Sequence, residues 1–99
     1  MVKERVAKSE SAVQQATATV GTSENGAVEL QRAKDNLQAA QAQLKAKNEK
    51  NAERYAQKAQ LDAELAVAKS QSGEARKAAD EVLASIETLR RESARPATN

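Results

Sequence analysis

Small side chains recur at alternating steps of four and three residues through the second half of the chain. The row comprises Ala52, Ala56, Ala59, Ala63, Ala66, Ser70 and Gly73. This spacing places all of them on one face of an α-helix. A second row has the same spacing but bulkier members, at Ala75, Ala79, Val82, Ile86 and Leu89. We therefore predict one long helix over residues 49–93. Its first half has a face of small side chains, and its second half has a face of larger aliphatic side chains.

Two shorter seams of the same kind come earlier in the sequence and predict helices over residues 2–20 and 27–47. The first seam comprises Val2, Val6, Ser9, Val13, Ala16 and Val20. The second comprises Leu30, Ala33, Leu37, Ala40 and Leu44. The GTSENG segment between them predicts a loop, with Gly21 in a left-handed cap and Ser23 or Asn25 as the next N-cap. So short a connection makes the two helices antiparallel.

The KNEKN segment at residues 47–51 predicts a second turn, in which Asn48 caps the next helix and Glu49 lies in its first turn. The alternative is an uninterrupted helix from Ala27 onward, because neither glycine nor proline enforces a break. Folding back is favoured, since it buries the seam from Leu30 to Leu44.

These elements predict an all-α fold: an antiparallel three-helix bundle or coiled coil with a long third helix. Residues 1–95 form a single helical domain, with the helix ended by Arg95-Pro96 and a disordered tail at 96–99. We expect Tyr55, Leu61 and Leu65 to close the bundle beside the alanine row. A four-helix arrangement is the alternative, because Gly73 costs a helix interior about 1 kcal/mol and could break it there.

An unbroken third helix would be about 65–70 Å long, whereas the first two helices would cover only about 30 Å of it. The distal aliphatic residues would then have no cover within the chain. They are Val82, Leu83, Ile86 and Leu89. Since an exposed apolar stripe of this size usually marks a contact, we expect a protein partner or self-association there.

Composition agrees with a narrow bundle, because 22 of the 39 apolar residues are alanine and the core must be thin. The 16 basic and 14 acidic residues are interspersed, as in Glu4 with Lys8, Arg76 with Asp80 and Glu87 with Arg91. With no basic block and one aromatic residue, Tyr55, the chain does not look like a nucleic-acid-binding protein. The absence of cysteine and histidine removes disulfides, thiol chemistry and the usual proton shuttle.

Catalysis is not expected, and no cofactor or metal site is predicted. The neighbouring carboxylates Asp62 with Glu64, and Asp80 with Glu81, point to different faces of a helix and not into one pocket. Arg90, Arg91 and Arg95 complement the dipole at the end of the third helix. The alternative role for these arginines is contact with an anionic surface, either membrane lipid or peptidoglycan.

The segments ELQRAKDNLQAA at 29–40 and AERYAQKAQLDAELAVAKS at 52–70 resemble the bacterial domain family DUF4398. Residues 62–66 match the family's Asp-Ala-Glu-Leu-Ala motif in place, and the likeness covers roughly residues 10–90. The chain departs from the family at the second turn, where Lys47-Asn48-Glu49 replaces a Gly-Asp-aromatic sequence. The resemblance supplies no catalytic residues.

The resemblance implies a cell-envelope setting, because such domains are typically exported, often as outer-membrane lipoproteins, and some precede an OmpA-like peptidoglycan-binding domain. We therefore expect a periplasmic, outer-membrane-associated, non-catalytic structural or interaction module, with Met1 placed before the mature part of an exported protein. One alternative is a helical protein that binds the surface of membrane or peptidoglycan. A weaker one is a cytoplasmic coiled-coil adaptor or a designed bundle.

Overall fold

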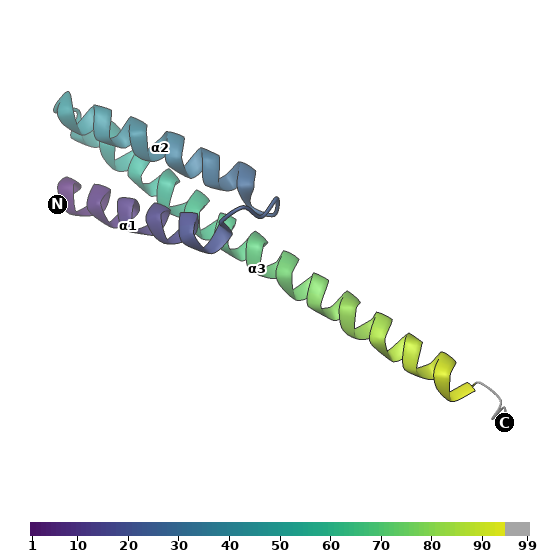
Figure 1. The fold of residues 1–99 in the computed structure, drawn as a ribbon. Helices are drawn as coiled ribbons and strands as arrows, with labels where there is room; N and C mark the ends of the chain where they lie inside the picture. The colour runs from purple at the N-terminus through teal and green to yellow at the C-terminus, as the bar shows by residue number, and fades with distance from the viewer. Residues whose placement is uncertain (95–99) are drawn as a thin grey trace.

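A computed structural model describes residues 1–94 of the chain, which form three helices joined by two short connections (Figure 1). The helices are α1, Val2–Val20, α2, Ala27–Lys45, and α3, Glu49–Ala94. Residues 1–94 contain no strand, which confirms the all-α prediction. The predicted helix end at Arg95-Pro96 and the tail at 96–99 lie outside the described residues.

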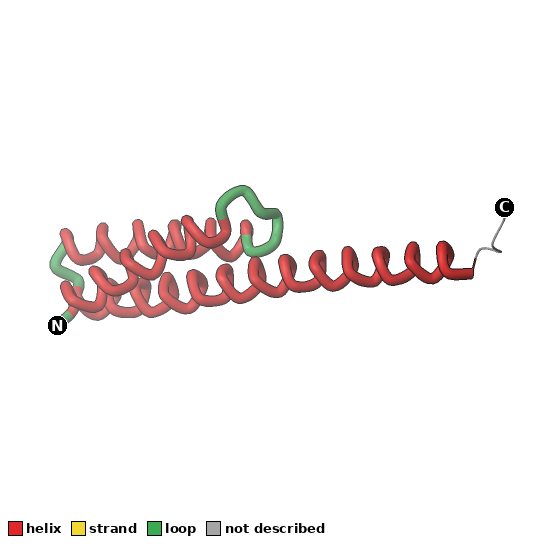
Figure 2. Tube along the Cα trace, turned by 60° about the horizontal axis from the view of Figure 1, so that its bottom comes forward, coloured by secondary structure: helices red, strands yellow, loops and turns green. Residues whose placement is uncertain are grey.

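The first two helices run antiparallel and pack along the first half of α3, while the second half of α3 projects beyond them (Figures 1 and 2). The N-terminus lies beside the start of α3, at the end of the molecule opposite the tip of α3 (Figure 1). The resulting shape is a rod of 81 × 19 × 16 Å. The predicted bundle with a long third helix is therefore confirmed.

The inner seam of α3 consists of the row of small residues from Ala52 to Ser70, and every member of it is buried. It meets the seam of α1, where Val6, Val13 and Val20 are buried, and the seam of α2 around Leu30. Alanines bury little apolar area each, but they let helix backbones approach closely along the whole contact. The core is thus a long strip of small contacts.

The prediction that Leu61 and Leu65 close the bundle is wrong, because both side chains are exposed. Each lies two residues from a member of the inner seam, and two residues rotate a helix by about 200°. Once the alanines face α1 and α2, these leucines must point away from them. Tyr55 is half-buried and packs against the small cluster of Val6, Ala40 and Ala56, as expected.

The first connection packs directly against α3. Gly26, with φ 89°, is the residue before α2, so the prediction of Ser23 or Asn25 as N-cap is wrong. A Cβ on Gly26 would lie 3.1 Å from the carbonyl carbon of Ala66 and closer still to its oxygen. Glycine is therefore needed both for the positive φ and for the close approach. The Ser23 hydroxyl instead accepts a hydrogen bond from the Asn25 N–H, at 3.1 Å.

The second connection ends α2 at Lys45, two residues before the predicted limit of 47. Lys47 has φ 62°, which stops the helix without glycine. The predicted cap at Asn48 is confirmed, because its Oδ1 accepts a hydrogen bond from the Asn51 N–H at 3.4 Å. An uninterrupted helix from Ala27 is thereby excluded.

The helix α3 continues through Gly73, so the four-helix alternative is wrong. The reason for glycine at this position is the first connection. A Cβ on Gly73 would lie 2.6 Å from Cγ of Asn25 and even closer to Nδ2. The missing side chain makes room for the loop, and the helix tolerates the loss of propensity.

Candidate functional site on the outer face of the third helix

The distal aliphatic residues Val82, Leu83, Ile86 and Leu89 are all exposed on the projecting half of α3. They lie beyond the part of α3 that α1 and α2 cover (Figure 1). As expected for an unbroken third helix, no other part of the described chain covers these residues. Their role in binding remains a prediction.

The exposed aliphatic surface extends into the bundle, which the sequence analysis missed. Leu61 and Leu65 have the same four-three spacing as the distal residues, and small exposed residues connect the two groups. We call this surface the outer stripe. It consists of Leu61, Leu65, Ala68, Ser72, Ala75, Ala79, Val82, Ile86 and Leu89. The spacing alone could have revealed it, had the two leucines not been assigned to the core.

The inner seam, in contrast, loses its apolar character where the bundle ends. At the same spacing beyond Gly73 come Lys77, Asp80, Glu87 and Arg91, with Ala84 among them. The distal half of α3 therefore has one apolar face, and that face is the outer stripe. Exposed large hydrophobic residues on it keep between 44 and 66 % of their accessible surface, with Leu83 beside them.

The predicted anionic-surface residues Arg90 and Arg91 are exposed near the tip of α3. Arg91 Nη2 donates a hydrogen bond to Glu87 Oε1 at 3.4 Å, in an exposed i,i+4 pair. Such a pair contributes only about 0.3–0.5 kcal/mol. Arg95, the third member of the cluster, lies outside the described residues.

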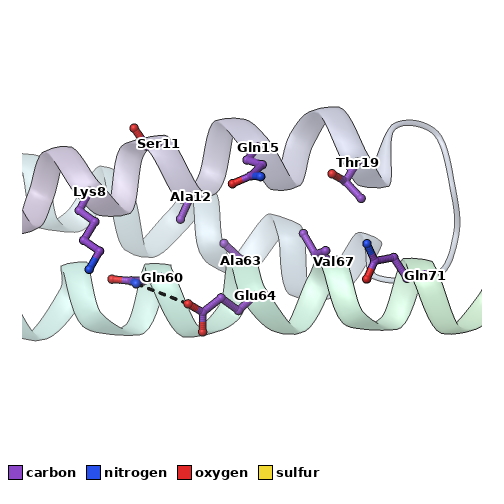
Figure 3. A pocket seen from close by; sticks show the side chains of 10 residues that line it. All are labelled: Lys8, Ser11, Ala12, Gln15, Thr19, Gln60, Ala63, Glu64, Val67 and Gln71. Carbon is purple, nitrogen blue, oxygen red and sulfur yellow. Dashed lines mark hydrogen bonds between the residues drawn. The ribbon is translucent and has the colours of Figure 1, made fainter.

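A shallow groove of about 470 Å³ runs between α1 and α3 (Figure 3). Ala12, Ala63 and Val67 line its apolar part, and amide and hydroxyl side chains form most of its rim. Gln60 Nε2 donates a hydrogen bond to Glu64 Oε1 at 3.4 Å (Figure 3). The groove presents one carboxylate, Glu64, and one amine, Lys8.

The carboxylates of Asp62 and Glu64 lie on different sides of α3, as predicted. Asp62 Oδ2 accepts a hydrogen bond of 2.8 Å from Asn36 Nδ2 on α2, whereas Glu64 faces the groove beside α1. Asp62 thus joins two helices. Within residues 1–94, no three acidic side chains come close enough together to hold a metal ion.

A second groove, of about 590 Å³, lies between the first connection and α3. On its wall, Lys69 Nζ donates to Glu29 Oε2 at 3.1 Å. This hydrogen bond lowers the pKa of the buried Glu29 carboxyl below its usual 4.5, and the opposing effect of burial does not cancel it. The ion pair fixes the start of α2 to α3 next to Gly26 and Gly73.

None of the three described helices has an apolar segment long enough to cross a lipid bilayer. The fold and its exposed face define a class of protein: a narrow all-helical bundle from which one helix projects with an uncovered aliphatic surface.

Within this class, the family model for the domain of unknown function DUF4398 matches residues 4–82, and the chain belongs to that family. The matched residues include the bundle and the first seven members of the outer stripe. Neither a curated protein nor a solved structure matches the chain.

Proposed function

We propose that this chain is a non-catalytic structural and protein-interaction module of the bacterial cell envelope, the mature part of an exported or outer-membrane-anchored protein. The observation that carries the interaction role is the uncovered aliphatic surface on the projecting half of α3. Soluble proteins rarely leave such a surface exposed unless another molecule covers it. The envelope setting comes from the resemblance to exported domains of the same family.

The shape of the molecule supports this role. The bundle holds α3 at one end through the inner seam, the Glu29–Lys69 pair and the Asp62–Asn36 hydrogen bond. The distal half of α3 extends away from that anchorage as a single helix (Figure 2). A partner can therefore reach its aliphatic side without rearranging α1 or α2.

A photocrosslinking amino acid at Ile86 tests the proposal in the native bacterium. We expect it to capture a protein in the envelope fraction, since this position faces outward from the projecting helix. The same amino acid at Lys77, on the polar side of α3, is the matched control and should capture far less. Combining Ile86→Lys with Leu89→Lys should abolish the association while circular dichroism still reports a helical chain.

Two results would contradict the proposal. The first is recovery of the protein in the cytoplasmic fraction. The second is an identical set of crosslinked products from the Ile86 and Lys77 positions, which would mean that the outer stripe has no special role.

A second candidate function is binding to an anionic surface, favoured by the exposed Arg90 and Arg91 near the tip of α3. Sedimentation with anionic vesicles or with peptidoglycan should then decrease as salt rises, because exposed charges are screened. Replacing both arginines with glutamine should abolish sedimentation. Sedimentation that is unchanged by salt and by these substitutions would exclude this alternative.

A further inference from the structure

We propose that the outer stripe is the seam of a parallel two-stranded coiled coil, in which α3 of one chain pairs in register with α3 of a second copy. This inference rests on the proposed interaction role of α3 and names its partner. It also extends the contact from the distal residues into the bundle, as far as Leu61.

The first argument is the length of the stripe. From Leu61 to Leu89 the four-three spacing continues without interruption, which amounts to about four heptads and about 43 Å of helix. A seam sustained for three to four heptads is typical of coiled coils. The distal residues alone would supply little more than one heptad, whereas inclusion of Leu61 and Leu65 gives a seam of sufficient length.

The second argument is the arrangement of side chains within the seam. Leu65, Ser72, Ala79 and Ile86 occupy a positions, and Leu61, Ala68, Ala75, Val82 and Leu89 occupy d positions. Large residues lie at both ends of the seam and small ones in the middle. A pair in register therefore places large residues of one helix against large residues of the other, and small residues against small ones. Ile86 at a, followed by Leu89 at d, is the combination that favours two strands.

The third argument is charge, which selects the parallel orientation. In a parallel pair each g position faces the e position five residues later on the other helix. Glu64 then faces Lys69 of the second copy, whose ammonium also donates to Glu29 of its own chain. Ala78 faces Leu83, so the exposed Leu83 gains an apolar neighbour. None of the other g–e pairs combines like charges; they are Gln57–Asp62, Gln71–Arg76 and Ser85–Arg90.

An antiparallel pair is less favourable. The register that matches large residues places Leu61 opposite Ile86 and Leu65 opposite Val82. In that register Lys69 faces Arg76 of the second copy, a like-charge contact that occurs twice, and Leu83 faces the carboxylate of Asp62.

The geometry of the bundle permits the parallel pair. The outer stripe lies on the side of α3 opposite the inner seam, so a second α3 can approach it without touching α1 or α2 of the same chain. The two bundles would then lie side by side at one end, separated by the paired α3 helices. Ser72 of each copy would share a layer at the centre of the seam.

The mass of the full chain in solution tests the pairing. We expect sedimentation equilibrium to give twice the chain's mass at high micromolar concentration. Leu65→Lys and, separately, Ile86→Lys should each raise the dimer Kd by at least about 100-fold, because each buries two unpaired ammonium groups per dimer. Ala84→Lys, on the polar side of α3, should leave it unchanged. Circular dichroism at dimer-forming concentrations verifies that each variant retains a helical bundle.

Disulfide formation tests the orientation, because the chain has no native cysteine. In the parallel register the two Ala68 positions face each other, so Ala68→Cys should crosslink to itself on mild oxidation. In the antiparallel register they are about 16 Å apart, too far for a disulfide, and Ala68→Cys should instead crosslink to Ala79→Cys. Ala84→Cys is the control and should not crosslink.

A monomeric chain at high micromolar concentration overturns this inference, and so does a dimer that crosslinks only between positions 68 and 79. A dimer disrupted by Ile86→Lys but unaffected by Leu65→Lys would also overturn it, because the seam would not extend into the bundle. None of these results removes the proposed interaction role, which fails only if the Ile86 crosslinker in cells captures nothing specific.

Discussion

At the residue scale, two glycines determine how closely the first connection approaches α3. Gly26 brings its backbone against the carbonyl group of Ala66, and Gly73 leaves room for the side chain of Asn25. The two contacts lie about two turns apart on α3, near the point where the bundle ends. The loop therefore closes the end of the core, and a side chain at either glycine would push it away.

We predict that the effect of Gly73→Ala depends on residue 25. In the wild-type chain, the new methyl group overlaps Asn25 and offsets the gain in helix propensity. With Asn25→Gly already present, the overlap disappears, and Gly73→Ala should raise the free energy of unfolding by about 1 kcal/mol. Urea denaturation of the four chains in this cycle measures the difference. Equal effects in both backgrounds would mean that the loop does not contact position 73.

We also predict that Glu29 gives the fold a specific dependence on pH. Its carboxyl has a pKa below 4.5 when folded, because Lys69 donates a hydrogen bond to the carboxylate. The resulting stabilisation is complete above pH 4.5 and disappears as the pH falls through the lower, folded-state pKa. The stability difference between wild type and Glu29→Gln should therefore shrink on acidification.

Urea denaturation at a series of pH values measures that difference directly. The control is the same pair of chains carrying Lys69→Met, in which the carboxylate has lost its donor and the pH-dependent part should decrease. A difference that stays constant from neutral to acidic pH would show that the ion pair does not stabilise the folded chain.

At the element scale, the inner seam determines where each helix can lie. Ala59 is fully buried between the other two helices, whose approach depends on its small size. We predict that Ala59→Leu lowers the free energy of unfolding by about 1–3 kcal/mol, because the helices must separate to admit the extra carbons. Thermal denaturation with Ala84→Leu, at an exposed position on the polar side of α3, is the matched comparison and should show a change below about 0.5 kcal/mol.

The helices themselves could be predicted from the sequence, because the four-three spacing specifies both their type and their buried faces. Their ends could not be predicted fully. The end of α2 depends on the positive φ of Lys47, and its start depends on Gly26 fitting against Ala66 rather than on a side-chain cap. The first is a conformation that lysine rarely adopts, and the second is a tertiary contact that local propensity does not contain.

The candidate site was half predicted. The distal aliphatic residues followed from the mismatch between the length of α3 and that of its partners. Leu61 and Leu65 were assigned to the core because large apolar residues are usually buried. In this chain alanines already fill the core positions, so the leucines lie outside, and only the packing of the three helices reveals them.

At the scale of the whole molecule, the two halves of α3 should differ in local stability. The first half packs against α1 and α2, whereas the second half is exposed along its length and lacks the tertiary packing that supplies most helical stability in proteins. We predict that backbone amides of residues 77–94 exchange hydrogen rapidly in the dilute chain and become protected as concentration rises and copies pair.

Hydrogen exchange followed by mass spectrometry over a dilution series measures this effect. Peptides from the first half of α3 serve as the internal reference, because their protection should not depend on concentration. Strong protection of residues 77–94 at every concentration would contradict the prediction, as would rapid exchange that persists in a sample shown to be dimeric.

The length of α3 separates the bundle from the far tip of the molecule. The N-terminus and the tip of α3 lie at opposite ends of the molecule, and α3 runs toward that tip without a hinge at Gly73. A partner bound near the tip of α3 would therefore lie far from the end of the bundle where α1 begins. Inserting or removing seven residues of α3, close to two turns, would change that separation by about 10.5 Å while nearly preserving the direction of the side chains at its far end.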